Sequence, residues 1–286
     1  MKPPYLHTRI FLDGGDPLET ASLLGELGFL DGQTTNPSLV AKNPEVRQRI
    51  DAGEKFTLPE LLGEYRAMAQ KIAALIPEGS VSLEVYADAA TSAEDMLREA
   101  REMHAWIPNA HIKFPIIRAG IRAAALAIEE GMRVNMTLCF SEEQAVAVAS
   151  ALRHAQKGAA FISPFIGRLD DQGRNGMDLI ANIARLYREA GSSVEVLAAS
   201  IRNEDHFLAS IARGADIVTA PFGILSAWAA KGAPLPAPEF VYAPELAPIP
   251  YRSVQFPADW ESVDITHPLT DNGLQRFNAD WQNLLR

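Results

Sequence analysis

The sequence predicts an α/β protein that folds as a single (β/α)8 barrel, and three observations lead to this fold class. Short apolar segments typical of strands alternate about eight times with segments of helical periodicity. Few hairpin signals separate them, which favours a parallel sheet with helical crossovers. About eight such units in roughly 230 residues is the size of a closed barrel. A doubly wound open sheet is the alternative, but Gly14-Gly15 lacks the glycine spacing of its phosphate loop.

The elements follow from local signals along the chain. Gly14-Gly15 ends the first strand and Asp16-Pro17 opens the first helix; Asn36-Pro37 ends the second strand and starts a new helical stretch. The expected strands are 8–13, 28–35, 81–86, 110–114, 134–140, 159–163, 194–199 and 216–219. The other expected helices are 58–75, 92–105, 116–130, 141–155, 176–190 and 222–230.

The chain divides into a catalytic barrel domain, residues 1–231, and a C-terminal part, residues 232–286. Residues 232–250 are rich in Pro and Ala and read as an irregular linker. Residues 271–285 predict a terminal helix with an apolar stripe of Leu274, Phe277, Trp281 and Leu284 on one face. A stripe of this kind must cover something, so we expect the helix to pack on the barrel or on a partner subunit in a homo-oligomer; the sequence leaves both open.

Composition narrows the classes of function. The chain has 286 residues, 48% hydrophobic and 22% charged, with a net charge of -10. A broad nucleic-acid surface is therefore not expected, and an anionic substrate would need a few locally placed cations. The single cysteine, Cys139, excludes an intrachain disulfide framework, and the histidines show no metal-ligand spacing, so no metal is expected. We find no membrane-spanning stretch and no signal-peptide core, and we expect a cytoplasmic protein.

A lysine in the apolar strand 110–114 is the first candidate catalytic group. Lys113 lies near the C-terminal end of this strand, where the active site of a barrel is built. Burial disfavours the charged amine and lowers its pKa, which leaves a neutral nucleophile suited to Schiff-base chemistry on a ketone. The alternative is a lysine that snorkels from the strand edge to water.

Polar side chains gather at the C-terminal ends of the other expected strands. Residues two apart share a face of a strand, and inward polar groups are costly unless they bond each other or a ligand. By this rule, the following residues lie together at or just beyond the ends of their strands: Asp13; Ser82, Glu84 and Tyr86; Asn135, Thr137 and Cys139; Ser163, Phe165 and Arg168; and Ser200 and Arg202. Their clustering at one end of the barrel predicts a ligand site.

The acidic and amide candidates each have a purely structural alternative. Asp13, before two glycines, suits a turn or a cap, and Asn36 before Pro37 suits a helix start. Glu84 could serve only to neutralise Lys113. Asn135 could fill the barrel with Thr137 as a polar pair.

The basic candidates and Cys139 also have structural alternatives. Arg168 and Arg202 could pair with nearby acids, namely Asp170, Asp171 or Glu204. His111 shares a face with Lys113 but lies deeper, and we interpret it as a packed core histidine. Cys139 is interpreted as a small buried hydrophobe.

Seven sequence strings are specific enough to compare with known families. The most specific are Thr34-Thr35-Asn36-Pro37-Ser38-Leu39 and Ser163-Pro164-Phe165-Ile166-Gly167-Arg168. The others are Phe11-Leu12-Asp13, Ser82-Leu83-Glu84-Val85, Ile112-Lys113-Phe114-Pro115, Asn135-Met136-Thr137-Leu138 and Ala199-Ser200-Ile201-Arg202-Asn203. In this order, the strings resemble the transaldolase family of class I aldolases, and the resemblance covers most of the chain.

The resemblance implies a barrel that uses no cofactor and works in the pentose phosphate pathway. It would move a dihydroxyacetone unit from a ketose phosphate (sedoheptulose 7-phosphate or fructose 6-phosphate) to an aldose phosphate. By matching position, Lys113 is similar to the Schiff-base lysine, Asp13 to the acid/base, and Glu84 and Thr137 to the pair that holds the water for proton transfers. The substrate-binding positions are Asn36, Asn135, Ser163, Phe165, Arg168, Ser200 and Arg202, of which Arg168, Ser200 and Arg202 resemble the phosphate clamp.

Alternatives within and beyond the family remain open at this stage. The related fructose-6-phosphate aldolases release free dihydroxyacetone and carry Gln and Tyr where this chain has Glu84 and Phe165, which favours a transferase. Residues 11–16 are closer to the short branch of the superfamily, whereas residues 263–271 resemble the longer transaldolases. A silent sugar-phosphate-binding barrel, and a transaldolase for another anion such as a sulfonated ketose, are the remaining hypotheses.

Overall fold

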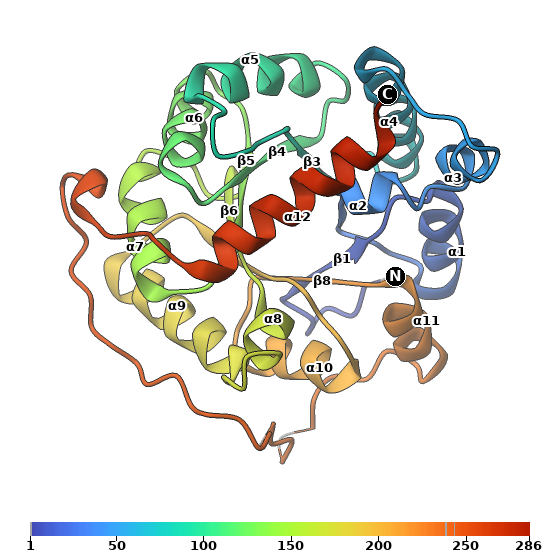
Figure 1. The fold of residues 1–286 in the computed structure, drawn as a ribbon. Helices are drawn as coiled ribbons and strands as arrows, with labels where there is room; N and C mark the ends of the chain where they lie inside the picture. The colour runs from blue at the N-terminus through green and yellow to red at the C-terminus, as the bar shows by residue number, and fades with distance from the viewer. Residues whose placement is uncertain (1, 238, 243) are drawn as a thin grey trace.

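The computed structural model describes residues 2–237, 239–242 and 244–286, and within these residues the chain forms a closed barrel of parallel strands in the order β1 to β8 (Figure 1). Strand β8 pairs with β1 and closes the ring. The strands are β1 (Arg9–Asp13), β2 (Gly32–Thr34), β3 (Ser80–Glu84), β4 (Ala110–Pro115), β5 (Val134–Cys139), β6 (Ala160–Pro164), β7 (Glu195–Ala198) and β8 (Ile217–Ala220). The predicted (β/α)8 barrel is confirmed, and the open-sheet alternative is wrong.

Helices surround the barrel (Figure 1). They are α1 (Pro17–Leu27), α2 (Pro37–Val40), α3 (Pro44–Asp51), α4 (Leu58–Leu75), α5 (Ala93–His104), α6 (Arg118–Glu129), α7 (Glu142–Ala151), α8 (Ile166–Asp170), α9 (Gly176–Ala190), α10 (Glu204–Ala212), α11 (Phe222–Ala230), the 3-10 turn η1 (Trp260–Ser262) and α12 (Pro268–Leu284). Side chains that accept backbone N–H groups fix several starts: Asp16 caps α1, and Thr57 with Glu60 forms a capping box on α4.

Some predictions about elements need correction. The helix expected over 141–155 ends at Ala151, and the terminal helix begins at Pro268, before the expected residue 271. The second strand is shorter than the expected 28–35, because Gly28 adopts a left-handed φ of 74° and ends α1, so that pairing with β1 starts only at Gly32. The short helices α8 and α10 were not expected; α10 begins where the Asn203 side chain accepts the backbone N–H of His206.

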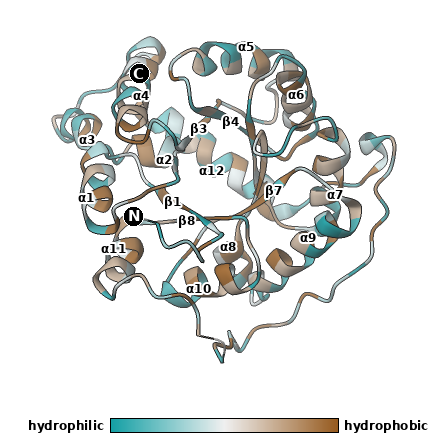
Figure 2. Ribbon diagram, turned by 180° about the vertical axis from the view of Figure 1, so that it is seen from behind, coloured by the Kyte–Doolittle hydropathy of each residue, from teal (hydrophilic) through white to brown (hydrophobic). Residues whose placement is uncertain are grey.

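The lower part of the barrel, at the N-terminal strand ends, is a packed core. His111 stacks on Phe161 with ring centroids 4.1 Å apart and contacts Ser80 through a 2.7 Å hydrogen bond. Burial lowers the pKa of His111 to about 3, so it is a neutral core histidine, as interpreted from the sequence. Viewed from behind, the strands and the helix faces turned toward them are hydrophobic (Figure 2).

The C-terminal part runs along the outside of the barrel and returns across its mouth (Figure 1). Within the described residues of 232–250 there is no helix or strand beyond an isolated bridge between Arg174 and Ala247. Helix α12 then lies over the C-terminal strand ends, where the Thr270 hydroxyl donates to the carbonyl of Leu138. In the part of the chain that the structure describes, no helix is long and apolar enough to cross a membrane.

Candidate active site

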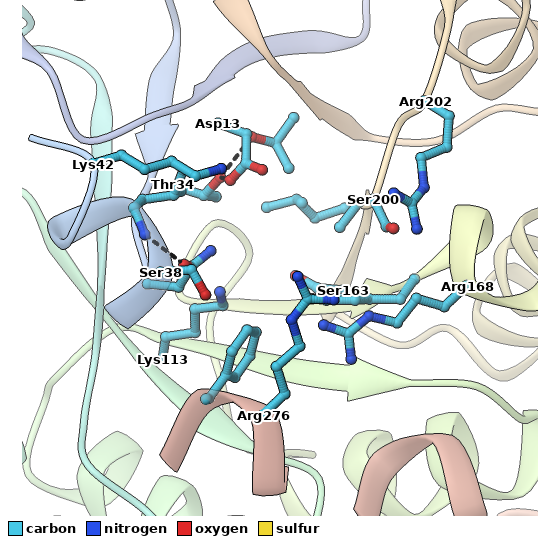
Figure 3. A pocket seen from close by; sticks show the side chains of 17 residues that line it. Asp13, Thr34, Ser38, Lys42, Lys113, Ser163, Arg168, Ser200, Arg202 and Arg276 are labelled. Carbon is cyan, nitrogen blue, oxygen red and sulfur yellow. Dashed lines mark hydrogen bonds between the residues drawn. The ribbon is translucent and has the colours of Figure 1, made fainter. Parts of the chain in front are cut away.

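A cavity of about 180 Å³ opens at the C-terminal end of the barrel, beneath α12 (Figure 3). Polar and charged side chains from at least six elements or their loops reach it. They are Asp13, Thr34, Asn36, Ser38, Lys42, Lys113, Ser163, Arg168, Ser200, Arg202, Thr219 and Arg276, with Phe165 and Phe277 among the apolar residues. A polar cavity at this end of a barrel is where such folds place their chemistry.

Lys113 and Glu84 form a buried ion pair at the base of this site. Their Cα positions are partners across β3 and β4, and Lys113 Nζ lies 2.7 Å from Glu84 Oε2. Each side chain is 4% exposed, so the alternative that Lys113 snorkels to water is wrong. Burial raises the pKa of Glu84 above its ordinary value, although the charge of Lys113 opposes this shift. The amine also donates to the carbonyl of Thr35 at 3.3 Å.

Asp13 lines the same cavity and is held as a hydrogen-bond acceptor. The Thr34 hydroxyl donates to Asp13 Oδ1 at 2.7 Å, and Thr34 is in turn 2.6 Å from the Thr219 hydroxyl. The cap of α1 is Asp16, so the alternative that Asp13 is a cap residue is wrong. Burial raises the pKa of Asp13, against the opposing influence of Lys113, Thr34 and, more weakly, Lys42.

A chain of buried hydrogen bonds crosses the barrel beside the lysine. Ser163 Oγ donates to Asn135 Oδ1 at 2.6 Å, and Asn135 Nδ2 donates to Ser82 Oγ at 3.1 Å. Ser163 faces the cavity, whereas Asn135 stands behind it. Asn36 satisfies both of its interpretations, because it caps α2 through Leu39 N and also lines the cavity.

Thr137 is buried on β5, and its hydroxyl has no hydrogen-bond partner among the described residues. Neither Thr137 nor Glu84 lines the cavity; Glu84 is the Cα partner of Lys113, and Thr137 is the partner of Pro115, two residues closer to the C-terminal strand end. Buried hydroxyls are rarely left unpaired, which makes Thr137 a candidate for binding a small polar group. Cys139, also on β5, is a buried free thiol whose pKa burial raises to about 12, consistent with the interpretation as a small hydrophobe.

Tyr65, on α4, links the residues around the ion pair. Its hydroxyl accepts the backbone N–H of Glu84 at 2.9 Å and lies 2.6 Å from Thr35 Oγ1. Thr35 Oγ1 uses its one proton to donate to the carbonyl of Ser82 at 2.6 Å, so Tyr65 is the donor to Thr35. The ring is fully buried and lies against Trp281 of α12 with centroids 6.3 Å apart.

The side of the cavity opposite Asp13 carries the arginines (Figure 3). The guanidinium of Arg168 lies 5.1 Å from the ring of Phe165 and 5.5 Å from that of Phe277. Burial, followed by the charges of Arg276 and Arg202, lowers the pKa of Arg168. The expected pairing with an acid is found for Arg202, which lies 2.8 Å from Asp171 in an exposed ion pair.

Ser200, with a left-handed φ of 61°, turns the chain between β7 and Arg202 at the edge of the cavity. All the substrate-binding candidates line the cavity except Asn135, which reaches it through Ser163.

Several cavity residues were not predicted as site residues from the sequence, among them Ser38, Lys42, Thr219, Arg276 and Phe277. Ser38 and Lys42 lie in and after α2, and the Ser38 hydroxyl donates to Asp280 of α12. Arg276 and Phe277 come from α12, and Phe277 covers Lys113 with its ring centroid 5.7 Å from Nζ. Phe277 belongs to the apolar stripe expected from the sequence, and Arg276 directly precedes it in α12.

Comparisons with known proteins cover nearly the whole chain. Residues 10–286 match the family model described as transaldolase/fructose-6-phosphate aldolase. A protein named probable transaldolase from Dehalococcoides mccartyi is 37% identical over 276 residues, covering 96% of this chain and 99% of that one. Another with this name, from Roseiflexus sp., is 36% identical over 276 residues, covering 96% and 97%. A solved structure of 3-hexulose-6-phosphate synthase from Salmonella typhimurium gives a TM-score of 0.47 at 13% identity, covering 79% of this chain and 96% of that one.

The sequence strings, the closed barrel and the match of a family model over residues 10–286 agree with one another. This chain is therefore an enzyme that belongs to the transaldolase/fructose-6-phosphate aldolase family.

Proposed function

We propose that this enzyme transfers a dihydroxyacetone unit from a ketose phosphate to an aldose phosphate through a Schiff base on Lys113. One observation carries the proposal: Lys113 Nζ is buried 2.7 Å from Glu84 and shares one cavity with Asp13. A dry amine beside a carboxylate of raised pKa can pass its proton on and attack a carbonyl carbon.

The reaction would start with the attack of the Lys113 amine on the C2 carbonyl of the ketose. Water leaves as the protonated imine forms, and Glu84 with Thr137 would hold this water and relay its protons. The buried hydroxyl of Thr137, without a partner among the described residues, supports this role.

The C3–C4 bond would then break. Asp13 accepts the proton of the C4 hydroxyl, the aldose phosphate leaves, and the bond electrons pass to the imine to give an enamine. A carboxylate whose pKa is raised toward the working pH suits this task, because it can both accept and return a proton. In the second half, the enamine attacks an acceptor aldehyde, Asp13 returns the proton, and water hydrolyses the new imine.

The binding groups would divide between the two ends of the sugar. Asn36 and Ser163, which line the cavity, would bind the dihydroxyacetone hydroxyls, and the hydrogen bond from Ser163 to Asn135 would orient Ser163. Arg168, Ser200 and Arg202 would bind the head group, because forked guanidinium donors match phosphate oxygens.

A lyase that releases dihydroxyacetone to water is the second candidate, since the family model covers both activities. The cover over the lysine favours the transferase. Phe277 lies above Lys113 Nζ, and α12 crosses the mouth of the barrel, so a covalent intermediate would be shielded from bulk water.

Acceptor dependence separates the two activities. Fructose 6-phosphate with erythrose 4-phosphate should give sedoheptulose 7-phosphate and glyceraldehyde 3-phosphate, and fructose 6-phosphate alone should release little dihydroxyacetone. Equal consumption of fructose 6-phosphate with and without the acceptor, with free dihydroxyacetone as product, would establish the lyase instead. The assay uses the full chain, because α12 contributes to the cavity.

A further inference from the structure

The part of the cavity lined by Arg168, Arg202 and Arg276 is called its outer half, and the part lined by Lys113, Asp13 and Lys42 its inner half. The outer half thus holds three guanidiniums, one more than the sequence strings suggested. Arg168 follows β6, Arg202 follows β7, and Arg276 comes from α12 (Figure 3). Figure 3 shows Arg276 reaching from its helix into the cavity, toward Ser163 and Arg168. The charges of both Arg276 and Arg202 act on Arg168, so the three lie within electrostatic reach of one another.

The inner half of the cavity is balanced in charge. Lys113 is neutralised by Glu84 at 2.7 Å, and the positive charge of Lys42 acts on Asp13. A neutral sugar backbone can therefore occupy this half of the cavity, because the charged side chains there compensate one another.

The outer half is not balanced. Among the described residues, Arg202 is the one arginine of the three with an ion pair, to Asp171. Asp170 pairs with His206, and Asp280 accepts the hydroxyl of Ser38. Asp171 and Asp280 keep their negative charges but do not line the cavity, so the charged side chains that line this wall are the three guanidiniums. Like charges held together disfavour one another, so the cluster is stable when an anion joins it.

We infer that Arg276 sets head-group specificity: with Arg168 and Arg202 it selects a dianionic phosphate monoester over a monoanionic head group such as a sulfonate. This inference rests on the proposed function for the identity of the sugar, but the charge preference belongs to the arginines themselves. A phosphate monoester carries close to two negative charges above its second pKa of about 6, whereas a sulfonate carries one. Three cationic side chains attract the dianion more strongly than the monoanion, and their forked donors can reach all three free oxygens of the phosphate.

The test removes one charge without disturbing the helix, because Arg276 is an exposed residue on α12. Arg276→Gln should lower kcat/KM for fructose 6-phosphate by about 10- to 100-fold, the range expected for a lost charged hydrogen bond. For 6-deoxy-6-sulfofructose the loss should be smaller, so the ratio of phosphate to sulfonate should fall by about tenfold. Borohydride trapping of dihydroxyacetone, which has no head group, should be unchanged within about twofold.

Two controls define the effect. Arg276→Lys keeps the charge and should recover part of the phosphate preference. Arg185→Gln removes an exposed arginine of α9 that pairs with Glu189 and does not line the cavity, and it should change none of these values.

In the wild type, KM for the phosphate donor should fall as pH rises through about 6, and Arg276→Gln should flatten this dependence.

A binding measurement separates this inference from the proposed function. Calorimetry with methyl phosphate and methanesulfonate needs no turnover: the wild type should prefer methyl phosphate at pH 7.5, and Arg276→Gln should lose that preference. Equal binding of both probes, or an unchanged preference in the variant, would overturn the role of Arg276 even if transfer occurs. Failure to trap dihydroxyacetone in the wild type would instead overturn the Schiff-base proposal and leave the calorimetric result standing.

Discussion

The hydroxyl of Tyr65 offers a sharp test of how the ion pair is held in place. Tyr65→Phe deletes one oxygen from a fully buried ring and leaves the packing against Trp106 and Trp281 in place. The oxygen makes two hydrogen bonds, 2.9 Å from the backbone N–H of Glu84 and 2.6 Å to Thr35 Oγ1. After the change, the Glu84 N–H is left buried without an acceptor.

A buried donor without a partner costs about 1–3 kcal/mol, so the free energy of unfolding should fall by that amount. The N–H belongs to the residue that pairs with Lys113, so kcat should fall while KM for the ketose phosphate stays nearly constant. The head-group arginines lie elsewhere in the cavity and are not touched. Urea unfolding followed by circular dichroism gives the first quantity, and steady-state kinetics give the second.

Tyr251→Phe is the matched control, because its hydroxyl makes a 2.6 Å hydrogen bond to Glu189 on the exposed surface. It should change stability by less than about 0.5 kcal/mol and leave kcat as it is. If Tyr65→Phe were as mild as this control in both measurements, the reasoning that Tyr65 positions Glu84 would be refuted.

Three further predictions follow from buried groups. Asp13→Asn should lower kcat by about 10²- to 10⁴-fold yet still form the borohydride-trapped imine, and loss of trapping would contradict its role after imine formation. The pKa of His111 is about 3 in the fold and 6.5 as a reference, so the unfolded state binds an extra proton between these values and stability falls as pH falls. Between pH 8 and pH 5, His111 should therefore lower the free energy of unfolding, measured by urea denaturation, by about 2 kcal/mol. If the free energy of unfolding of His111→Gln depended on pH as steeply as that of the wild type, this prediction would be refuted. Gly120→Ala would place Cβ 2.1 Å from the carbonyl oxygen of Pro115 and should destabilise by about 1–3 kcal/mol, whereas Gly63→Ala, with open space around it, should stabilise slightly; equal thermal shifts would contradict this.

Much of the barrel could be predicted because its signals are local. The helices 58–75, 176–190 and 222–230 have the predicted bounds, since each combines apolar periodicity with a clear start or stop. The second strand was drawn too long because Gly28 was taken as its first residue, whereas a left-handed glycine ends a helix. The nine-residue α10 lacks the length that makes periodicity visible.

The inner half of the site followed from the two-residue period of strands. Glu84 and Lys113 were placed on inward faces, and they meet as Cα partners in adjacent strands. The outer half depends on tertiary structure. Arg276 lies 163 positions after Lys113, and its place in the cavity follows only from the return of α12 across the barrel mouth.

Once the structure is known, one face of α12 shows which of its residues reach the site. Gly273, Arg276, Phe277 and Asp280 recur at helical spacing, and each contacts the site: a Cβ at Gly273 would meet an Arg168 nitrogen at 2.7 Å, and Asp280 accepts the Ser38 hydroxyl. Of these four residues, only Phe277 belongs to the apolar stripe that the sequence predicts. The polar ones beside them gain meaning only when the surface that the helix covers is known.

In the proposed mechanism, the amine of Lys113 forms the covalent bond to the substrate. Borohydride reduction of the wild-type enzyme with fructose 6-phosphate, followed by peptide mapping, tests this claim without any substitution that would leave Glu84 unpaired. We expect a reduced dihydroxyacetone adduct on Lys113 alone. An adduct on Lys42, the other lysine of the cavity, or steady transfer with no adduct at all, would contradict it.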